Sequence, residues 1–307
     1  MFFNRIVNCP LCGRESNLGA PATISPWVRE LGIRSRISKF YLCEICNTGF
    51  FSKRYTDEEM SKIYRDYRGS NYLKLRSKWE PWYTESYNSN HDSVEWVNSR
   101  KISLTEFLIS NEIFECDVMI DVGGDRGQYI PDFVANKIVI ELSEKELSAN
   151  VRRIDSIENA PYANLIIYAH VLEHVVDPIS ELEKLFDKTD QVYVEVPYGI
   201  PEINKDRMSI RRFLLQQIYS LNPKFWAKSA HPATGRRVAP TKMLTQSEHL
   251  TFFSEKSFEK IAETLGVSLI VARNTISTPD FSTSSVIQCL LIRSSSKIDT
   301  KDSAKDS

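Results

Sequence analysis

The stretch Asp117–Gly127, DVMIDVGGDRG, joins a short apolar run to a glycine-rich turn. Further apolar runs follow it along the chain, at 137–141, 165–169, 192–196, 267–273 and 286–292. Helices are predicted between the early runs, over 128–135 and 177–185, the second with Asp177 as N-cap and Pro178 in its first position. Buried strands that alternate with helices form parallel sheets covered on both faces. The fold class predicted is therefore α/β, with a Rossmann-like doubly wound sheet.

Four of the six cysteines form two C-x2-C pairs, Cys9 with Cys12 and Cys43 with Cys46. Two such pairs can complete a tetrahedral site of four thiolates, the usual form of a structural zinc site. A closed site of this kind leaves no position for substrate, so the zinc would hold the fold together. The alternative is a redox C-x-x-C pair, which normally occurs once, near a βαβ unit.

The composition is that of an ordinary globular protein, with 42% apolar and 26% charged residues in a chain of 307. Thr56 and Glu59 predict a capping box for a helix that ends at Gly69. The predicted units are a zinc ribbon (1–54), a helical, aromatic-rich linker or lid (55–115), an α/β domain (116–293) with a basic insert (205–242), and a disordered tail (294–307).

Charge and hydropathy exclude several classes of protein. The net charge of -1 argues against a surface that binds nucleic acid throughout. No apolar run reaches the about 18 residues that span a bilayer. Because the first ten residues lack the apolar core of a secretory signal, we expect a cytoplasmic protein.

The glycine-rich turn predicts a nucleotide site. Asp121, Gly123, Gly124 and Gly127 form a strand-to-helix turn that a ligand can approach closely, and Glu141 ends the next strand, where a carboxylate can accept both hydroxyls of a ribose. The dinucleotide fingerprint G-x-G-x-x-G does not fit, because Asp125 stands where its second glycine would be.

This region resembles the class I S-adenosylmethionine-dependent methyltransferases, whose first motif is D/E-x-G-x-G-x-G. Asp121, Gly123 and Gly127 match the motif, and Asp125 departs from it at the middle glycine. The resemblance implies that residues 116–293 bind S-adenosylmethionine (SAM), with Glu141 on the ribose and Asp155 near the adenine amine.

Three further segments resemble the type 11/23 group of these enzymes, namely 165–178 (LIIYAHVLEHVVDP), 195–197 and 249–254 (HLTFFS). The cysteine pairs ahead of the domain and the run Tyr64–Gly69 resemble the zinc-containing sugar methyltransferases. The resemblance implies methyl transfer to a hydroxyl or carbon of a nucleotide-sugar or glycan, in surface-polysaccharide or related glycan biosynthesis.

His170, Glu173, His174 and His249 are predicted to form the active site, because the first three follow the fourth strand at the ligand-binding edge. A sugar hydroxyl needs a general base or a metal ion to remove its proton. Related enzymes with E-x-x-E-H in this position bind a divalent ion, so two hypotheses stay open: a metal held by these residues, or His174 or His249 as the base. Two other interpretations are an H-x-x-E-H peptidase and residues that only brace the loop.

The insert 205–242 holds nine Lys and Arg residues against one acid, Asp206. Such a segment suits a phosphate-bearing substrate, a membrane surface contacted through 205–228, or simply solvent. Two other functions are compatible with the sequence: an RNA methyltransferase with a zinc-ribbon recognition module, and a SAM-binding scaffold without catalysis. Neither the acceptor nor the oligomeric state follows from the sequence.

Overall fold

The structure is a computed structural model that describes residues 7–80, 83–89, 92–141, 145–203, 214, 217–218, 221, 244–277 and 283–294. Nearly all of the basic insert 205–242 and of the predicted tail 294–307 lies outside the described residues. The predictions of a membrane or phosphate contact through 205–228 and of a disordered tail therefore stay predictions. No helix in the described part of the chain has the length and apolar character needed to cross a membrane.

The larger of the two main sheets has seven strands in the order β13-β14-β10-β9-β6-β7-β8. Its strands are β6 (Cys116–Val122), β7 (Val134–Ile140), β8 (Val151–Ile154), β9 (Leu165–Ala169), β10 (Gln191–Pro197), β13 (Ser268–Ser277) and β14 (Thr283–Ile292). The five strands from β8 to β10 pair in parallel, whereas β14 is antiparallel to both of its neighbours. From β6 the chain adds β7 and β8 on one side and then β9 and β10 on the other, so the predicted Rossmann-like sheet is confirmed.

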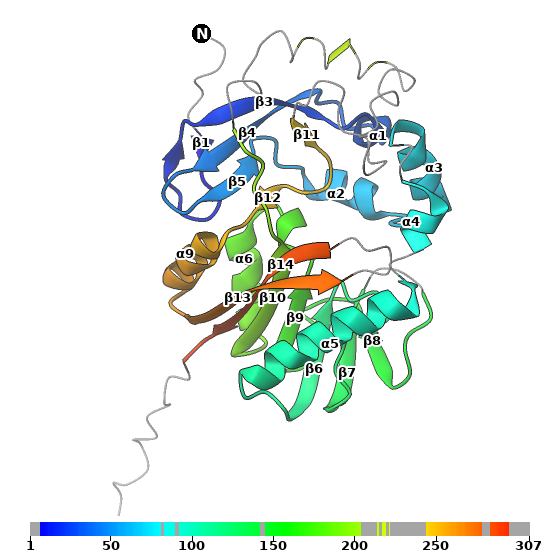
Figure 1. Ribbon diagram of the computed structural model, residues 1–307, viewed down its shortest axis with the longest axis vertical. Helices are drawn as coiled ribbons and strands as arrows, with labels where there is room; N and C mark the ends of the chain where they lie inside the picture. The colour runs from blue at the N-terminus through cyan, green and yellow to red at the C-terminus, as the bar shows by residue number, and fades with distance from the viewer. Residues whose placement is uncertain are drawn as a thin grey trace, which may run out of the picture.

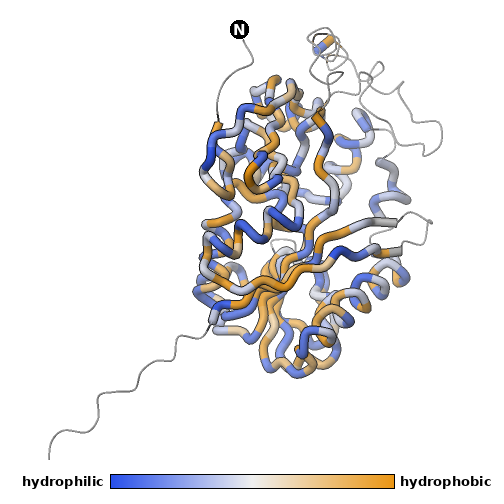
Figure 2. The backbone as a smooth tube through the Cα atoms, turned by 60° about the vertical axis from the view of Figure 1, so that its left-hand side comes forward, coloured by the Kyte–Doolittle hydropathy of each residue, from blue (hydrophilic) through white to orange (hydrophobic). Residues whose placement is uncertain are grey.

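Helices cover both faces of this sheet, and α5 (Val94–Ser110) crosses its front in Figure 1. Phe107 and Leu108 of α5 share a buried cluster with Met119 and Tyr193 of the sheet. On the other face, α6 (Pro178–Phe186) and α9 (Glu255–Leu265) pack against apolar strand residues. Figure 2 shows the apolar residues gathered along these strands. Side chains on both faces of one sheet are thus withdrawn from water, as the continuous apolar runs require.

Local signals fix several helix ends. Thr56 and Glu59 form the predicted capping box of α2 (Asp57–Tyr64). Asp177 caps α6 by accepting a hydrogen bond from the amide of Ser180, and Pro178 opens that helix. These predictions are confirmed, because each depends only on residues within one helical turn.

Two predictions about local structure are wrong. The segment 128–135 is a series of turns and then the start of β7, not a helix. Only 123–133 separate β6 from β7, and Pro131 lacks the amide hydrogen that a helix there would need. Gly69 is the N-cap of α3 (Ser70–Trp79) and not a C-cap, since α2 ends at Tyr64 and Arg68 takes the left-handed conformation instead.

The second main sheet contains segments from distant parts of the chain, in the order β11-β3-β4-β5-β12. Its strands are β3 (Gly19–Ile24), β4 (Ile37–Cys43), β5 (Thr48–Phe51), β11 (Leu244–Gln246) and β12 (Thr251–Phe252). It lies above the larger sheet in Figure 1, near the short pair β1 (Val7–Asn8) and β2 (Glu15–Ser16) and the helices α1 (Pro26–Glu30), α2, α3 and α4 (Glu85–Ser89). The sequence predicted 1–54 and 116–293 as two separate units. This sheet instead combines β3, β4 and β5 from the first unit with β11 and β12 from the second.

Arg54 ties the two sheets together. Its guanidinium donates five hydrogen bonds, to the carbonyls of Val175, Val176 and Leu250 and to the hydroxyl of Thr251, over 2.6 to 3.0 Å. Val175 and Val176 follow β9, and Leu250 precedes β12, so one side chain holds the loops from both sheets in place.

The variant Arg54→Met should lose about 3–5 kcal/mol of unfolding free energy, because three carbonyls lose their donors in a partly buried place. Urea unfolding followed by circular dichroism measures the change. The exposed Arg34→Met is the matched control and should stay within about 0.5 kcal/mol of the wild type. Equal midpoints for Arg54→Met and the wild type would contradict the role given to Arg54.

Candidate active site and metal centre

The four paired cysteines meet in one cluster. The Sγ atoms of Cys9 and Cys46 lie 3.6 Å apart, those of Cys12 and Cys43 3.5 Å apart, and those of Cys12 and Cys46 3.7 Å apart. A tetrahedron with Zn–S bonds of about 2.3 Å has edges of about 3.8 Å, so four thiolates in this arrangement fit one zinc ion. Each of these sulfur–sulfur contacts joins a cysteine of the first C-x2-C pair with one of the second. Two independent redox pairs would have no reason to lie together in this way.

The cysteine cluster is joined to the larger sheet through α9. The hydroxyl of Thr48 donates to Ser257 over 2.9 Å, and Ser257 donates to the carbonyl of Cys46 over 3.2 Å. Three of the cysteines are buried in the same apolar cluster as Phe258 of α9. A metal at this site would therefore fix the position of the smaller sheet against the larger one.

The predicted donor residues lie along one edge of the larger sheet. Gly123 follows β6, Glu141 follows β7 and Asp155 follows β8, and these three strands are neighbours in that order. Glu141 accepts a hydrogen bond from the amide of Asp125 over 3.2 Å. The carboxyl ends of adjacent parallel strands are where such sheets bind their ligands.

The turn after β6 tolerates Asp125 in place of the motif's middle glycine. Gly123, Asp125 and Gly127 have φ of 71°, 55° and 70°, all in the left-handed region. Aspartate is one of the few residues that enter this region readily. A side chain on Gly124 would lie 2.2 Å from the Asp121 carboxyl group, so the turn is closed there to any larger residue.

Asp121 is buried beneath that turn, and its Oδ2 has no hydrogen-bond partner among the described residues. Burial raises the pKa of Asp121 to about 7, although the guanidinium of Arg100 opposes the shift. A buried oxygen that lacks a hydrogen-bond partner can accept a hydrogen bond from an N–H or O–H group of a ligand.

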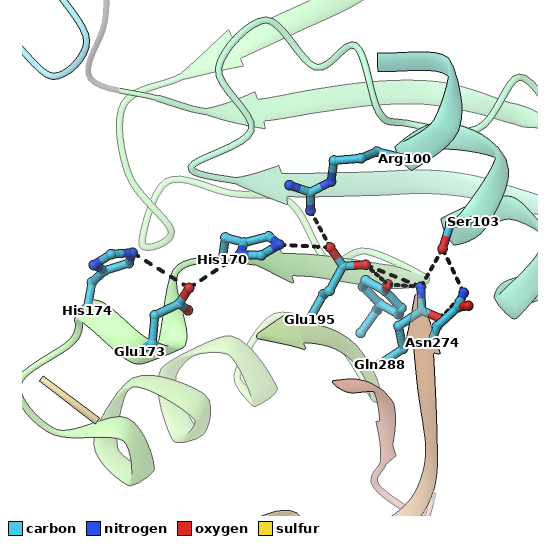
Figure 3. Close-up of polar contacts among 9 residues, drawn as sticks. Arg100, Ser103, His170, Glu173, His174, Glu195, Asn274 and Gln288 are labelled. Carbon is cyan, nitrogen blue, oxygen red and sulfur yellow. Dashed lines mark hydrogen bonds and ion pairs between the residues drawn. The ribbon is translucent and has the colours of Figure 1, made fainter. Parts of the chain in front are cut away.

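Three of the four predicted catalytic residues, His170, Glu173 and His174, lie together just past β9 (Figure 3), and His249 joins them from the segment before β12. The Glu173 carboxylate lies 3.4 Å from Nδ1 of His170 and 3.7 Å from Nε2 of His174. The rings of His174 and His249 meet edge to face with centroids 4.6 Å apart. β9 and β6 are paired, so this cluster, which we call the histidine cluster, lies beside the donor turn.

His170 faces a carboxylate with each ring nitrogen. Its Nδ1 faces Glu173, and its Nε2 lies 3.1 Å from Glu195 of β10. Burial and Arg100 lower the pKa of His170, but the two carboxylates outweigh them and raise it overall. Both nitrogens are thus placed to donate, which favours a charged, structural imidazolium over a base or a metal ligand.

Glu195 is the centre of a polar network that the sequence did not predict (Figure 3). Arg100 pairs with it, and Tyr193 and Gln288 donate to it over 2.8 and 3.2 Å. Arg100 comes from α5, far from Glu195 in sequence, and no local motif points to it. Glu195 itself was quoted in a strand-end motif without a role.

His174 has the geometry of a neutral base. Its Nδ1 lies 3.3 Å from the carbonyl of Glu248, and a carbonyl only accepts, so Nδ1 carries the proton and the Nε2 lone pair faces Glu173. Burial and the neighbouring His249 lower the pKa of His174 to about 4, although Glu173 opposes the shift. At neutral pH the imidazole can accept a proton at Nε2.

Glu173, His174 and His249 also fit a divalent cation. Their ligand atoms lie within 4.8 Å of one another. The buried Glu173 carboxylate has no close hydrogen bond from a described residue; its contacts are the longer ones of 3.4 Å to His170 and 3.7 Å to His174. The contact of the His174 Nδ1 with a backbone carbonyl is typical of histidines that bind metal through the other nitrogen. His170 lies outside this set, so three of the four predicted residues could act as ligands.

Tyr64 and Arg76 border the histidine cluster and had not been assigned to it. The ring of Tyr64 lies edge to face with His174 at 5.8 Å, and its buried hydroxyl has no partner among the described residues. Arg76 pairs with Glu248 over 3.0 Å and so fixes the residue whose carbonyl orients His174. The sequence signals for this part of the site were the resemblance of Tyr64–Gly69 to the sugar methyltransferases and the adjacency of Glu248 to His249.

The fold and the site define a Rossmann-like α/β protein whose sheet edge combines a glycine-rich turn with a buried histidine cluster. No protein-family model and no curated protein matches the sequence. Among solved structures, the plantazolicin methyltransferase BpumL with bound SAH is 12% identical, with 76% of this chain and 93% of that chain covered and a TM-score of 0.41.

Two other solved structures are similar at the same level. The 1,6-didemethyltoxoflavin-N1-methyltransferase of Burkholderia thailandensis is 10% identical, covers 84% of this chain and 96% of its own, and gives a TM-score of 0.45. The magnesium protoporphyrin IX methyltransferase ChlM of Synechocystis PCC 6803 is 14% identical, covers 68% and 87%, and gives 0.38. Identities and scores this low do not define a function, which we infer from the residues of the site.

Proposed function

We propose that this chain is a SAM-dependent methyltransferase whose acceptor is a hydroxyl group of a sugar. The observation that supports it most is the adjacency of two sites on paired strands. A turn suited to a nucleoside follows β6, and a neutral histidine whose unprotonated Nε2 lies 3.7 Å from Glu173 follows β9. Methyl transfer from a sulfonium requires alignment of donor and acceptor and removal of the acceptor proton, which these two sites would supply.

The donor would lie across the ends of β6, β7 and β8. In this proposal Glu141 accepts hydrogen bonds from the ribose hydroxyls, and Asp155 lies at the next strand end, where the adenine would extend. The buried carboxyl of Asp121 supports the turn from below. The glycines allow the ligand to contact the backbone closely.

On the acceptor side, Nε2 of His174 would receive the hydroxyl proton, and Tyr64 would contact the sugar. If a divalent cation is bound, Glu173, His174 and His249 would hold it, and it would supply acidification of the hydroxyl. A sugar acceptor is supported by the sequence resemblance of the cysteine pairs and of Tyr64–Gly69 to the zinc-containing sugar methyltransferases.

Calorimetric titration of the purified chain with SAM and with S-adenosylhomocysteine (SAH) tests the donor part of this proposal. Incubation with methyl-labelled SAM and a panel of nucleotide-sugars and glycans then tests the acceptor part. Binding of SAH together with label on a sugar is the expected result. A chain that binds neither SAM nor SAH would refute the enzymatic function.

The variant Glu141→Ala should weaken SAH binding about 10- to 100-fold, because hydrogen bonds to a carboxylate contribute about 1.5–3 kcal/mol. Calorimetry gives the two dissociation constants directly. The nearby exposed Glu146→Ala is the matched control, and its affinity should equal that of the wild type. An unchanged affinity in Glu141→Ala would mean that the donor does not use this strand end.

A further inference from the structure

We propose that Arg68 anchors an anionic group, a phosphate or a carboxylate, of the acceptor. This inference rests on the proposed function and deepens it, because it assigns a charged feature to the substrate. Arg68 lies in the turn between α2 and α3, four residues after Tyr64, which contacts His174. Three features of the residue support the assignment, namely its backbone conformation, its lack of a carboxylate partner and its location.

The backbone of Arg68 is held in an unfavourable conformation. Its φ is 60°, in the left-handed region of the backbone, which residues other than glycine, asparagine and aspartate rarely adopt. The Arg68 carbonyl accepts a hydrogen bond from Nδ2 of Asn88 over 2.8 Å, and Oδ1 of Asn88 accepts one from the hydroxyl of Tyr83 over 2.7 Å. Strained residues that neighbouring groups fix in this way are concentrated at functional sites.

The guanidinium of Arg68 lacks a carboxylate partner among the described residues, although the side chain is partly buried. Its side-chain partner is Tyr67, to which it is hydrogen-bonded and whose ring centre lies 5.3 Å from the guanidinium carbon. Arg76 and Arg100, in contrast, pair with Glu248 and Glu195. A guanidinium that is withdrawn from water without an acidic neighbour favours binding of an anion from outside the chain.

The side chain of Arg68 lies among tyrosines. Burial lowers the pKa of Arg68, but the phenols of Tyr67, Tyr83 and Tyr129 outweigh it and raise the pKa overall. The residue is therefore a permanent cation in an aromatic setting. Such a setting holds the planar guanidinium in one orientation, and the N–H donors that Tyr67 does not use remain for an oxyanion.

The tyrosines that interact with Arg68 connect it with both halves of the proposed site. Tyr129 belongs to the turn segment after Gly127, on the donor side. The ring of Tyr67 is 5.1 Å from that of Tyr64, which in turn contacts His174. An acceptor with its hydroxyl at His174 could thus extend its anionic group toward Arg68. The excess positive charge of 205–242 in the sequence suits the same kind of acceptor.

The test measures anion binding without turnover. Inorganic pyrophosphate and malonate are titrated by calorimetry into the full chain saturated with SAH, as probes for phosphate and carboxylate. The variants are Arg68→Gly, which relieves the backbone strain, and Arg68→Lys, which keeps the charge. Arg65→Gln removes an exposed cation from the same turn and is the matched control. Thermal unfolding confirms that each variant is folded.

We expect the wild type to bind at least one probe, and the better probe to indicate which anion the acceptor carries. Arg68→Gly should weaken that binding at least tenfold, Arg68→Lys should weaken it less, and Arg65→Gln should leave it unchanged. If neither probe binds, or if folded Arg68→Gly and Arg68→Lys bind as tightly as the wild type, this inference is overturned. Absence of SAH binding would instead reject the proposed function, which the same titrations reveal separately.

Discussion

Serine in place of Cys43 should unfold the smaller sheet and abolish donor binding at the distant glycine-rich turn. Structural zinc sites contribute about 10–16 kcal/mol to the folding of small zinc modules at neutral pH, more than the whole stability of most domains. The four sulfur atoms lie at the separations of a zinc tetrahedron, so loss of one ligand should release the metal.

The effect should reach the active site because the cysteine cluster and the larger sheet share a core. Cys43 and Cys46 are buried in the same apolar cluster as Ile120 of β6. β12, which follows His249 and Leu250, pairs with β5 of the smaller sheet. Once that sheet loosens, His249 and the loop of His174 lose their support.

Zinc content measured by mass spectrometry, urea unfolding and SAH calorimetry together check this prediction. Cys116→Ser is the matched control, since Cys116 is buried, lies outside the cluster and should affect neither zinc nor SAH binding. The prediction fails if the wild type contains no zinc and Cys43→Ser unfolds at the same urea concentration.

Alanine in place of His174 should reduce kcat about 10²- to 10⁴-fold while leaving SAH affinity unchanged. This is the range expected when a positioned general base is removed. The Nε2 lone pair of His174 faces the cluster interior because its Nδ1 is committed to the Glu248 carbonyl. The donor residues lie on other strands, so their binding should not depend on it.

The same variant separates the two ways in which the site could activate a hydroxyl. Single-turnover rates are measured for the wild type and His174→Ala, and Mn²⁺ is titrated into both by calorimetry. Tight Mn²⁺ binding that is lost in His174→Ala and in His249→Ala would indicate a metal held by Glu173 and the two histidines. Full activity in His174→Ala, with or without added metal, would dismiss a role for this residue in proton removal.

Much of the fold was predictable because it depends on short segments. The apolar runs and the turn at Asp117–Gly127 predicted the parallel sheet, and the capping box at Thr56 needed only residues three apart. The cysteine pairs predicted a four-thiol cluster from spacing alone. Each of these signals reflects interactions within one turn or one strand, where sequence and geometry correspond closely.

The helix expected at 128–135 marks the limit of such reasoning. The glycine-rich turn favoured a helix after it, but the distance between β6 and β7 left room for turns only. The active site shows the same limit. Glu173 and His174 were predicted from their place after a strand, whereas Arg100 is brought there by α5, which carries no motif.

By itself, then, the sequence determined six of the seven strands of the larger sheet, all but β8, together with the turn that a nucleoside would contact and the cysteines that would hold zinc. Only the tertiary structure decided that β11 and β12 complete the smaller sheet and that His170 lies between two carboxylates. The physical reason is that burial and ion pairing join residues far apart in the chain. The Glu195 that fixes His170 becomes its neighbour only when β9 and β10 pair.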